Sequence, residues 1–208
     1  MNMGANAHEK VSKTRASAPE RSLSRGRVTF GFWIYLMSDC VLFAALFATF
    51  AVLRGATFGG ATPAELVDVP FVFKETIILL TSSFTVGLAL LAALQGRKIF
   101  TLAALTVTLA LGATFLMMEL SEFAHLISEG NGPSRSAFLS AFFTLVGTHG
   151  AHVFFGAIWM IVLMAHILTK GTTEGNLRKL TCLALFWHFL DVIWIFIFTY
   201  VYLLGMVI

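Results

Sequence analysis

Nine acidic or histidine side chains, chosen from those within long apolar stretches of the sequence or close to their ends, are candidates for a buried polar layer. If such a stretch crosses a membrane, an acidic residue at its centre costs about 2.5–3.5 kcal/mol on insertion scales, so its position carries information. These side chains can relay protons, bind metals, contact lipids or form hydrogen bonds between helices. The nine residues are Asp39, Glu75, Glu119, Glu122, His125, His149, His152, His188 and Asp191.

Three of these residues are expected in one layer. With a rise of about 1.5 Å per residue, Asp39 lies about 13 Å, His188 about 11 Å and Asp191 about 15 Å from the start of their predicted helices. A neutral His188 can donate a hydrogen bond to either carboxylate, or the carboxylates can share a proton. A structural anchor and a proton or lipid contact both remain open for this layer.

A second group is expected toward the opposite side of the membrane. Glu119, Glu122 and His125 follow each other at intervals of three, which places them along one helical stripe. His149 and His152 belong to the segment THGAH, for which packing or hydrogen bonding is the favoured interpretation. Glu75 opens the second apolar stretch and completes this buried polar layer.

Two kinds of metal site are disfavoured. Glu122 and His125 form an E-x-x-H pattern, but a carboxylate-bridged di-iron site needs a second copy and two further carboxylates. A haem between His152 and His188 is disfavoured because the two residues are predicted at different depths. The sequence therefore predicts no metal ligands and no catalytic residues in this chain.

The elements that carry these residues are predicted from composition and length. The 208 residues are 58% hydrophobic and 12% charged, whereas soluble domains have about 25% charged residues. A helix of about 20 apolar residues crosses a hydrocarbon core of about 30 Å and satisfies its own backbone. We expect an all-α polytopic membrane protein whose domain, residues 30–208, is one bundle of five transmembrane helices. The predicted spans are about 30–53, 72–94, 99–120, 138–168 and 181–204.

The first 29 residues are predicted to be a disordered, basic, cytoplasmic tail. They contain six Lys or Arg residues and no apolar run, so we expect neither a cleavable signal peptide nor a nucleic-acid partner. Eleven basic residues lie on the side of the tail and three on the other side. The positive-inside rule therefore predicts a cytoplasmic N-terminus and a periplasmic C-terminus.

Aromatic and small residues predict how the helices pack. Trp187 and Trp194 frame His188 and Asp191 in the segment LFWHFLDVIWIF. Gly147 and Gly150 belong to a surface of small residues, which lets helices approach each other closely in membranes.

Three segments in order resemble subunit III of the haem–copper respiratory oxidases: FGFWIYLMSDCVLFAALFATFAV, SAFFTLVGTHGAHVFFGAIWM and LFWHFLDVIWIFIFTYVYL. The similarity covers about residues 28–205. The five-span form most resembles the bacterial cytochrome bo-type ubiquinol oxidases, since cytochrome c oxidase relatives usually have seven spans. In the family motifs, Asp39 takes the place of a buried carboxylate that is often Glu, and Glu122, His149 and His152 match further motif positions.

The resemblance implies an accessory subunit without a cofactor of its own, in a proton-translocating ubiquinol oxidase of the bacterial inner membrane. Haems and copper are expected in partner subunit I, against which this chain would pack in a complex with subunits II and IV. Bound phospholipid and support of proton uptake are also implied. His188 and Asp191 would then tie the fifth span to the first through Asp39.

Three alternatives remain open. The chain could be subunit III of a cytochrome c oxidase, because nothing within it selects the electron donor. A stand-alone proton-coupled transporter would use Asp39, His188 and Asp191 as a relay, although the sequence has no internal repeat. A metal enzyme would use Glu122 and His125 and would contain stoichiometric iron.

Overall fold

The computed structural model describes residues 30–59 and 69–204, and the predicted tail, residues 1–29, lies outside them. The chain divides into two units, Met1–Cys40 and Val41–Ile208. Regular structure in the described residues is helical throughout. Five helices are long and apolar enough to cross a membrane, beginning with Phe30–Leu53, which runs from the first unit into the second. The predicted all-α polytopic fold is confirmed.

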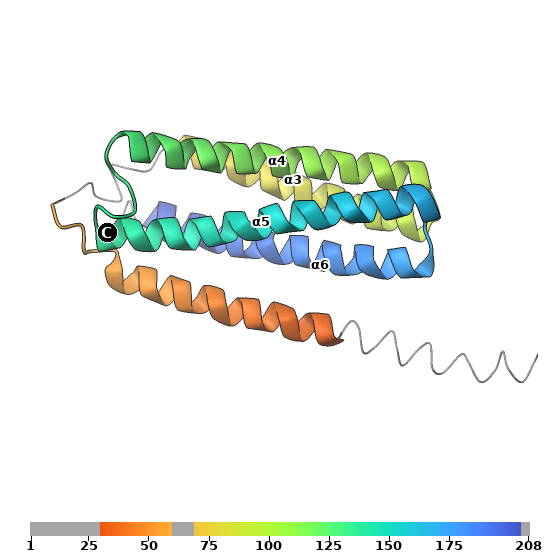
Figure 1. Cartoon of the computed structure of the whole chain (residues 1–208), viewed down its shortest axis with the longest axis horizontal. Coiled ribbons are helices and arrows are strands. Elements are labelled where there is room, and N and C mark those ends of the chain that lie inside the picture. Colours follow the sequence, from red (N-terminus) through yellow and green to blue (C-terminus); the bar gives the residue numbers. More distant parts are fainter. Residues whose placement is uncertain (1–29, 60–68, 205–208) are drawn as a thin grey trace, which may run out of the picture. The chain divides into compact units, whose positions relative to one another are not determined.

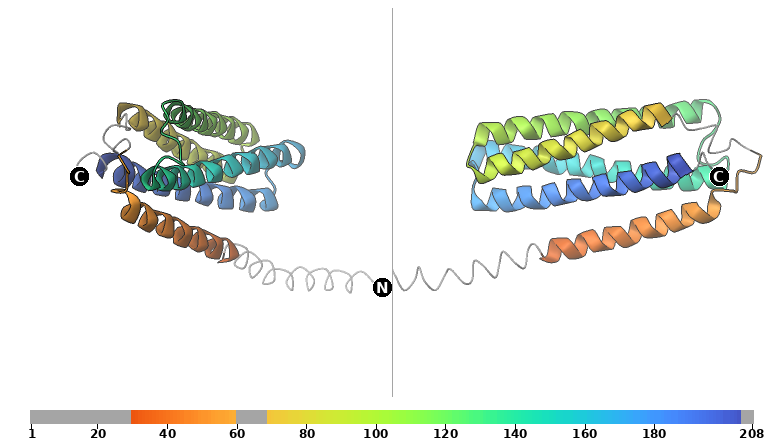
Figure 2. Two further views of the ribbon diagram at one scale, coloured as in Figure 1. Left: turned by 60° about the vertical axis from the view of Figure 1, so that its left-hand side comes forward. Right: turned by 180° about the vertical axis from the view of Figure 1, so that it is seen from behind.

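The second unit contains four long helices that run side by side (Figures 1 and 2). Helix α3 packs against α4 and α6, and α5 packs against the same two helices, so the four form a closed ring. Short connections between consecutive helices make neighbours antiparallel. The bounds are α3 Val69–Leu94, α4 Lys98–Ser128, α5 Ala137–Lys170, α6 Glu174–Ile197 and the π-helical turn η1 Phe198–Leu203.

Side chains at the helix ends fix where the helices start and stop. Ser136 accepts a hydrogen bond from Leu139 N at 3.1 Å, and Thr173 accepts one from Asn176 N at 3.3 Å, which satisfies backbone donors at the starts of α5 and α6. Gly171 follows α5 with a φ of 72°, a left-handed value that ends the helix at little steric cost.

Two helices extend further than their apolar stretches predict. Helix α4 continues to Ser128 rather than ending near residue 120, and α6 starts at Glu174 rather than near residue 181. Their polar end turns are helical as well, because the backbone bonds of a helix do not depend on apolar side chains. His188 therefore lies about 21 Å from the start of its helix, near the middle of α6, whereas the predicted 11 Å counts from the start of the apolar stretch alone.

Trp187 of α6 connects all four helices of the ring. Its side chain is 1% exposed, and its indole N–H donates to Ser82 Oγ of α3 at 2.8 Å. Gly112 of α4 and Gly156 of α5 leave room for the ring: a Cβ at Gly112 would lie 2.8 Å from Trp187 Cζ2, and one at Gly156 would lie 3.2 Å from Cζ3. The small residues are thus complementary to one large ring.

Trp194, two helical turns later, repeats this arrangement. Its N–H donates to Thr76 Oγ1 of α3 at 3.0 Å. Its ring lies 4.7 Å from Phe115 of α4 and 5.2 Å from His149 of α5, measured between ring centroids. The two tryptophans thus contact the other three helices of the ring at two levels of α6.

Candidate functional site

Ser83 of α3 brings together the two ionisable residues of the LFWHFLDVIWIF segment. His188 Nδ1 lies 2.6 Å from Ser83 Oγ, and the Ser83 side chain is hydrogen-bonded to Asp191. A hydroxyl group has one proton, so when Ser83 donates to Asp191 its oxygen accepts from His188 Nδ1–H. Asp191 is buried, whereas His188 also reaches the surface of the chain. We call Ser83, His188 and Asp191 the serine tie.

Sequence reasoning missed Ser83, although Ser82 and Ser83 stand out as a polar pair within an apolar stretch. The third member of the predicted layer, Asp39, belongs to the other unit. There it is hydrogen-bonded to the Tyr35 hydroxyl one turn earlier. A direct tie from His188 or Asp191 to Asp39 stays a prediction.

Three carboxyl groups gather at the end of the bundle where α6 continues into η1. Glu75 of α3 is completely buried, and its carboxyl group lies within electrostatic range of those of Glu119 and Glu122 of α4. Tyr202 of η1, also buried, donates a hydrogen bond to Glu122 Oε2 at 3.2 Å. Neither oxygen of Glu75 has a hydrogen-bond partner among the described residues. These four residues form the acidic group.

His149 lies beside the acidic group within an aromatic cage. Its side chain is completely buried and contacts Trp194, Phe115 and Phe43, with ring centroids 5.2, 5.9 and 6.4 Å away. Neither ring nitrogen has a hydrogen-bond partner among the described residues. The contacts of His149 among the described residues are thus aromatic, and its role in packing stays a prediction.

The other two histidines of the predicted layer differ in their surroundings. His152 Nδ1 lies 2.7 Å from the Thr148 carbonyl oxygen in its own helix, and its ring lies 5.3 Å from Phe43. His125 lies away from the buried group, with 71% of its side chain exposed and its Nε2 3.4 Å from Glu129 Oε1. Within residues 30–59 and 69–204, no three His, Cys, Asp or Glu side chains are placed to hold a metal ion.

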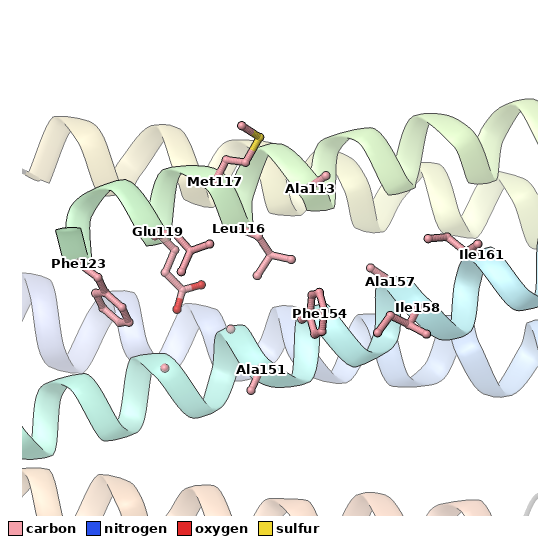
Figure 3. Close-up of a pocket in the computed structure, with 13 residues that line it drawn as sticks. Ala113, Leu116, Met117, Glu119, Phe123, Ala151, Phe154, Ala157, Ile158 and Ile161 are labelled. Carbon is pink, nitrogen blue, oxygen red and sulfur yellow. The ribbon is translucent and has the colours of Figure 1, made fainter. Parts of the chain in front are cut away.

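A groove of about 550 Å³ lies between α4 and α5, and we call it the α4–α5 groove (Figure 3). The Glu119 side chain extends from α4 toward α5, where Figure 3 shows its carboxyl group between the two helices. All other side chains of the lining are apolar. The lining consists of Ala113, Leu116, Met117, Glu119, Leu120, Phe123, Gly147, Gly150, Ala151, Phe154, Ala157, Ile158 and Ile161.

Gly150 makes the position of Glu119 possible. A Cβ at residue 150 would lie 2.5 Å from Glu119 Oε1 and 2.7 Å from Oε2, so any larger residue would displace the carboxyl group. Gly147, one turn away, has its nearest neighbour, Phe123, at 3.6 Å from such a Cβ. The predicted small-residue surface therefore accommodates a buried acid at Gly150 and an aromatic ring at Gly147.

The sites described so far can form hydrogen bonds, hold protons and receive apolar molecules. The serine tie joins α3 to α6, and the hydrogen bond from Tyr202 to Glu122 joins η1 to α4. In the low dielectric of a membrane, such bonds fix the relative positions of helices that apolar contacts alone would leave less defined.

Comparison with known proteins shows the family to which this chain belongs. Residues 17–206 match the family described as cytochrome c oxidase subunit III. The cytochrome bo(3) ubiquinol oxidase subunit 3 of Pseudomonas aeruginosa is 58% identical over 182 residues, which cover 88% of this chain and 87% of the relative.

Two further relatives match a larger part of this chain. Cytochrome bo(3) ubiquinol oxidase subunit 3 of Buchnera aphidicola, subspecies Acyrthosiphon pisum, is 40% identical over 205 residues, which are 99% of this chain and 94% of the relative. Cytochrome c oxidase subunit 3 of Bacillus sp. strain PS3 is 44% identical over 208 residues, covering 97% of this chain and 99% of the relative. The similarity thus extends over nearly complete chains.

Proposed function

Because the chain belongs to the family of haem–copper oxidase subunit III, we propose that it is the third subunit of a ubiquinol oxidase that reduces oxygen to water and pumps protons. The observation that carries this proposal is the extent of the similarity, which includes all five apolar helices and the segments between them. Relatives named as ubiquinol oxidase subunits include one with 58% identity, which favours ubiquinol as the electron donor of the complex.

In this proposal the chain is an accessory subunit without a catalytic residue or redox cofactor of its own. Subunit I, which would hold the haems and copper, is the main partner, with subunits II and IV in the same complex. The complex would reside in the bacterial inner membrane, with the N-terminus of this chain in the cytoplasm and bound phospholipid at its surface. Exposed apolar side chains such as Phe154, Phe155 and Val162 on α5 suit contact with lipid or with a partner helix.

Buried polar side chains carry the two parts of the proposed role, which are stabilisation of subunit I and support of proton uptake. The serine tie and the two indole hydrogen bonds give the bundle fixed contact points, so that it can stabilise subunit I as a rigid body. Asp39, with the Tyr35 hydroxyl beside it, is the residue that we assign to the support of proton uptake.

The test is a purification of the tagged chain in a mild detergent from the bacterial membrane, followed by a dithionite-reduced minus oxidised spectrum. We expect haem bands, larger co-purifying subunits and cyanide-sensitive oxidation of ubiquinol. An unrelated tagged membrane protein from the same membranes serves as the control. A colourless, monodisperse chain of 22.7 kDa without partners would contradict the proposal and favour the stand-alone transporter.

A second candidate is subunit III of a cytochrome c oxidase, which the 44% identical relative of that name supports. The same preparation separates the two, because it can be assayed with ubiquinol and with reduced cytochrome c in parallel. Oxidation of reduced cytochrome c alone would assign the chain to the second candidate and leave its place in the family unchanged.

A further inference from the structure

The accessory role does not account for the α4–α5 groove or for the buried carboxyl group that lines it. We propose that it binds one quinol molecule, with a ring hydroxyl group donating a hydrogen bond to Glu119 and the isoprenoid chain lying along α4 and α5. This inference rests on the proposed function, since a ubiquinol oxidase works in a membrane that contains its quinol. The proposed step is binding alone.

Glu119 supplies the polar contact. Its side chain is 3% exposed, and its Oε2 has no hydrogen-bond partner among the described residues. A buried hydrogen-bond acceptor without a donor raises the free energy of the folded protein. A ligand whose hydroxyl group donates to Glu119 removes this cost. Glu75 and Glu122, the other acids of the acidic group, are absent from the lining. The groove therefore offers a single acceptor.

The charges of the groove select a neutral head group. None of the thirteen lining residues is basic, so the phosphate of a phospholipid would find no cation there. Glu119 also lies nine residues before Ser128 at the end of α4, which is about 13 Å along the helix. A charged head group that is buried beside Glu119 without a counter-ion is costly. A quinol head carries hydroxyl groups and no charge, and it meets both conditions.

The size and shape of the groove suit a ring with a short part of its chain. Its volume of about 550 Å³ is within the range of roughly 300–1,000 Å³ that is usual for small-molecule sites. Phe123 and Phe154 flank Glu119 along the groove (Figure 3) and can pack against an aromatic ring. From Phe123 the lining continues to Ala113, about 15 Å along α4, which gives the first isoprene units an apolar path.

The experiment uses the purified complex and a short-chain ubiquinol that carries a photoreactive diazirine next to its ring. Excess dithionite under argon keeps the probe in the quinol form and prevents turnover. After illumination, we expect labelled peptides of this chain within residues 113–123 or 147–161. Unlabelled ubiquinol should compete with the probe, and phosphatidylethanolamine should not.

Three variants in the assembled complex assign the label to the groove. Ala151→Phe, which fills the groove, should abolish labelling there, and Glu119→Leu, which removes the acceptor, should reduce it roughly three- to tenfold. Val162→Phe places the same ring on an exposed part of α5 outside the lining and should keep full labelling. The haem spectrum of each preparation first verifies assembly, so failure of the proposed function is recognised separately.

Three results would overturn the inference. In the first, the assembled complex is labelled elsewhere and this chain is not. In the second, phosphatidylethanolamine displaces the probe where ubiquinol does not, which would make the groove a phospholipid site. In the third, Ala151→Phe leaves the label unchanged but releases a partner subunit, which would identify the groove as a helix-docking surface.

Discussion

At the scale of single residues, each indole N–H of α6 donates to a hydroxyl group of α3. Trp187 and Trp194 bond to Ser82 and Thr76, and Thr76 also donates to the Val72 carbonyl oxygen of its own helix. The Thr76 hydroxyl group thus uses its proton within its helix and its lone pair between helices, whereas Ser82 donates to the Thr108 carbonyl oxygen of α4 at 3.4 Å. The bonds between the helices therefore leave the backbone hydrogen bonds of α3 intact.

Trp187→Phe should lower the free energy of unfolding by about 0.5–1.5 kcal/mol through the lost hydrogen bond, besides the effect of the smaller ring. Ser82→Ala should have a similar effect, and the double variant should cost less than the sum, because both changes remove the same bond. Steric trapping of the purified chain in bicelles measures the free energy of unfolding of the two single variants and of the double variant. Strictly additive effects would contradict a direct bond.

Asp39→Asn should leave the haem spectrum of the complex unchanged but speed the loss of this subunit or of activity during sustained turnover. The amide keeps the size of the side chain and removes its capacity to carry a charge. Ser38→Ala is the matched control, because Ser38 donates only to the Tyr35 carbonyl oxygen, at 2.6 Å, in its own helix. Loss of the haem bands in Asp39→Asn would refute the accessory role.

At the scale of helices, close approach depends on where glycine faces a large ring. Gly112 and Gly87 both lie within apolar helices, but a Cβ added at Gly112 would meet the Trp187 ring, whereas one added at Gly87 would have no neighbour within 4 Å. Substitutions at Gly112 and Gly87 therefore distinguish the effect of a contact between helices from the effect of helix propensity.

Gly112→Ala should destabilise the bundle by about 1–3 kcal/mol, because the methyl group overlaps the Trp187 ring. Gly87→Ala should be neutral or stabilising by up to about 1 kcal/mol, since alanine is the better helix former. Thermal release of this subunit from the purified complex reports both effects. Equal behaviour of the two variants would show that the ring can move aside.

The π-helical turn η1 gives a second prediction for a helix. A π-turn behaves as one extra residue in an α-helix, and each α-helical residue turns by about 100°. Deletion of the exposed Thr199 should convert η1 to an α-helix and keep Tyr202 facing Glu122, with the complex assembled. Insertion of one alanine after Phe198 should turn Tyr202 away and weaken assembly. If the deletion weakened assembly of the complex more than the insertion did, this interpretation of η1 would be refuted.

At the scale of the whole molecule, the predicted orientation in the membrane rests on eleven basic residues on one side of the apolar helices and three on the other. An epitope tag at the C-terminus should be cleaved by protease added to intact spheroplasts, whereas a tag at the N-terminus should survive until the membrane is permeabilised. Cleavage of the N-terminal tag in intact spheroplasts would reverse the predicted topology.

The sequence predicts the five helices well, because a membrane leaves few alternatives to a long apolar helix. It also predicts that His188 and Asp191 share an environment. It could not identify Ser83 or Thr76 as partners, since most hydroxyl groups in these helices simply bond to their own backbone, as Thr108 does with the Ala104 carbonyl oxygen. Helix ends were missed because polar end turns, such as the one after Thr173, carry no hydropathy signal.

The two indole bonds also have a consequence for the order in which the protein is made. They join residues 105 and 118 positions apart, and in each case the donor belongs to α6, which leaves the ribosome after the other three helices of the ring. Until α6 is inserted, the hollows at Gly112 and Gly156 and the hydroxyl groups of Ser82 and Thr76 face lipid. A nascent chain stalled before α6 thus leaves two hydroxyl groups and two glycine hollows without the aromatic side chains that fill them in the complete bundle.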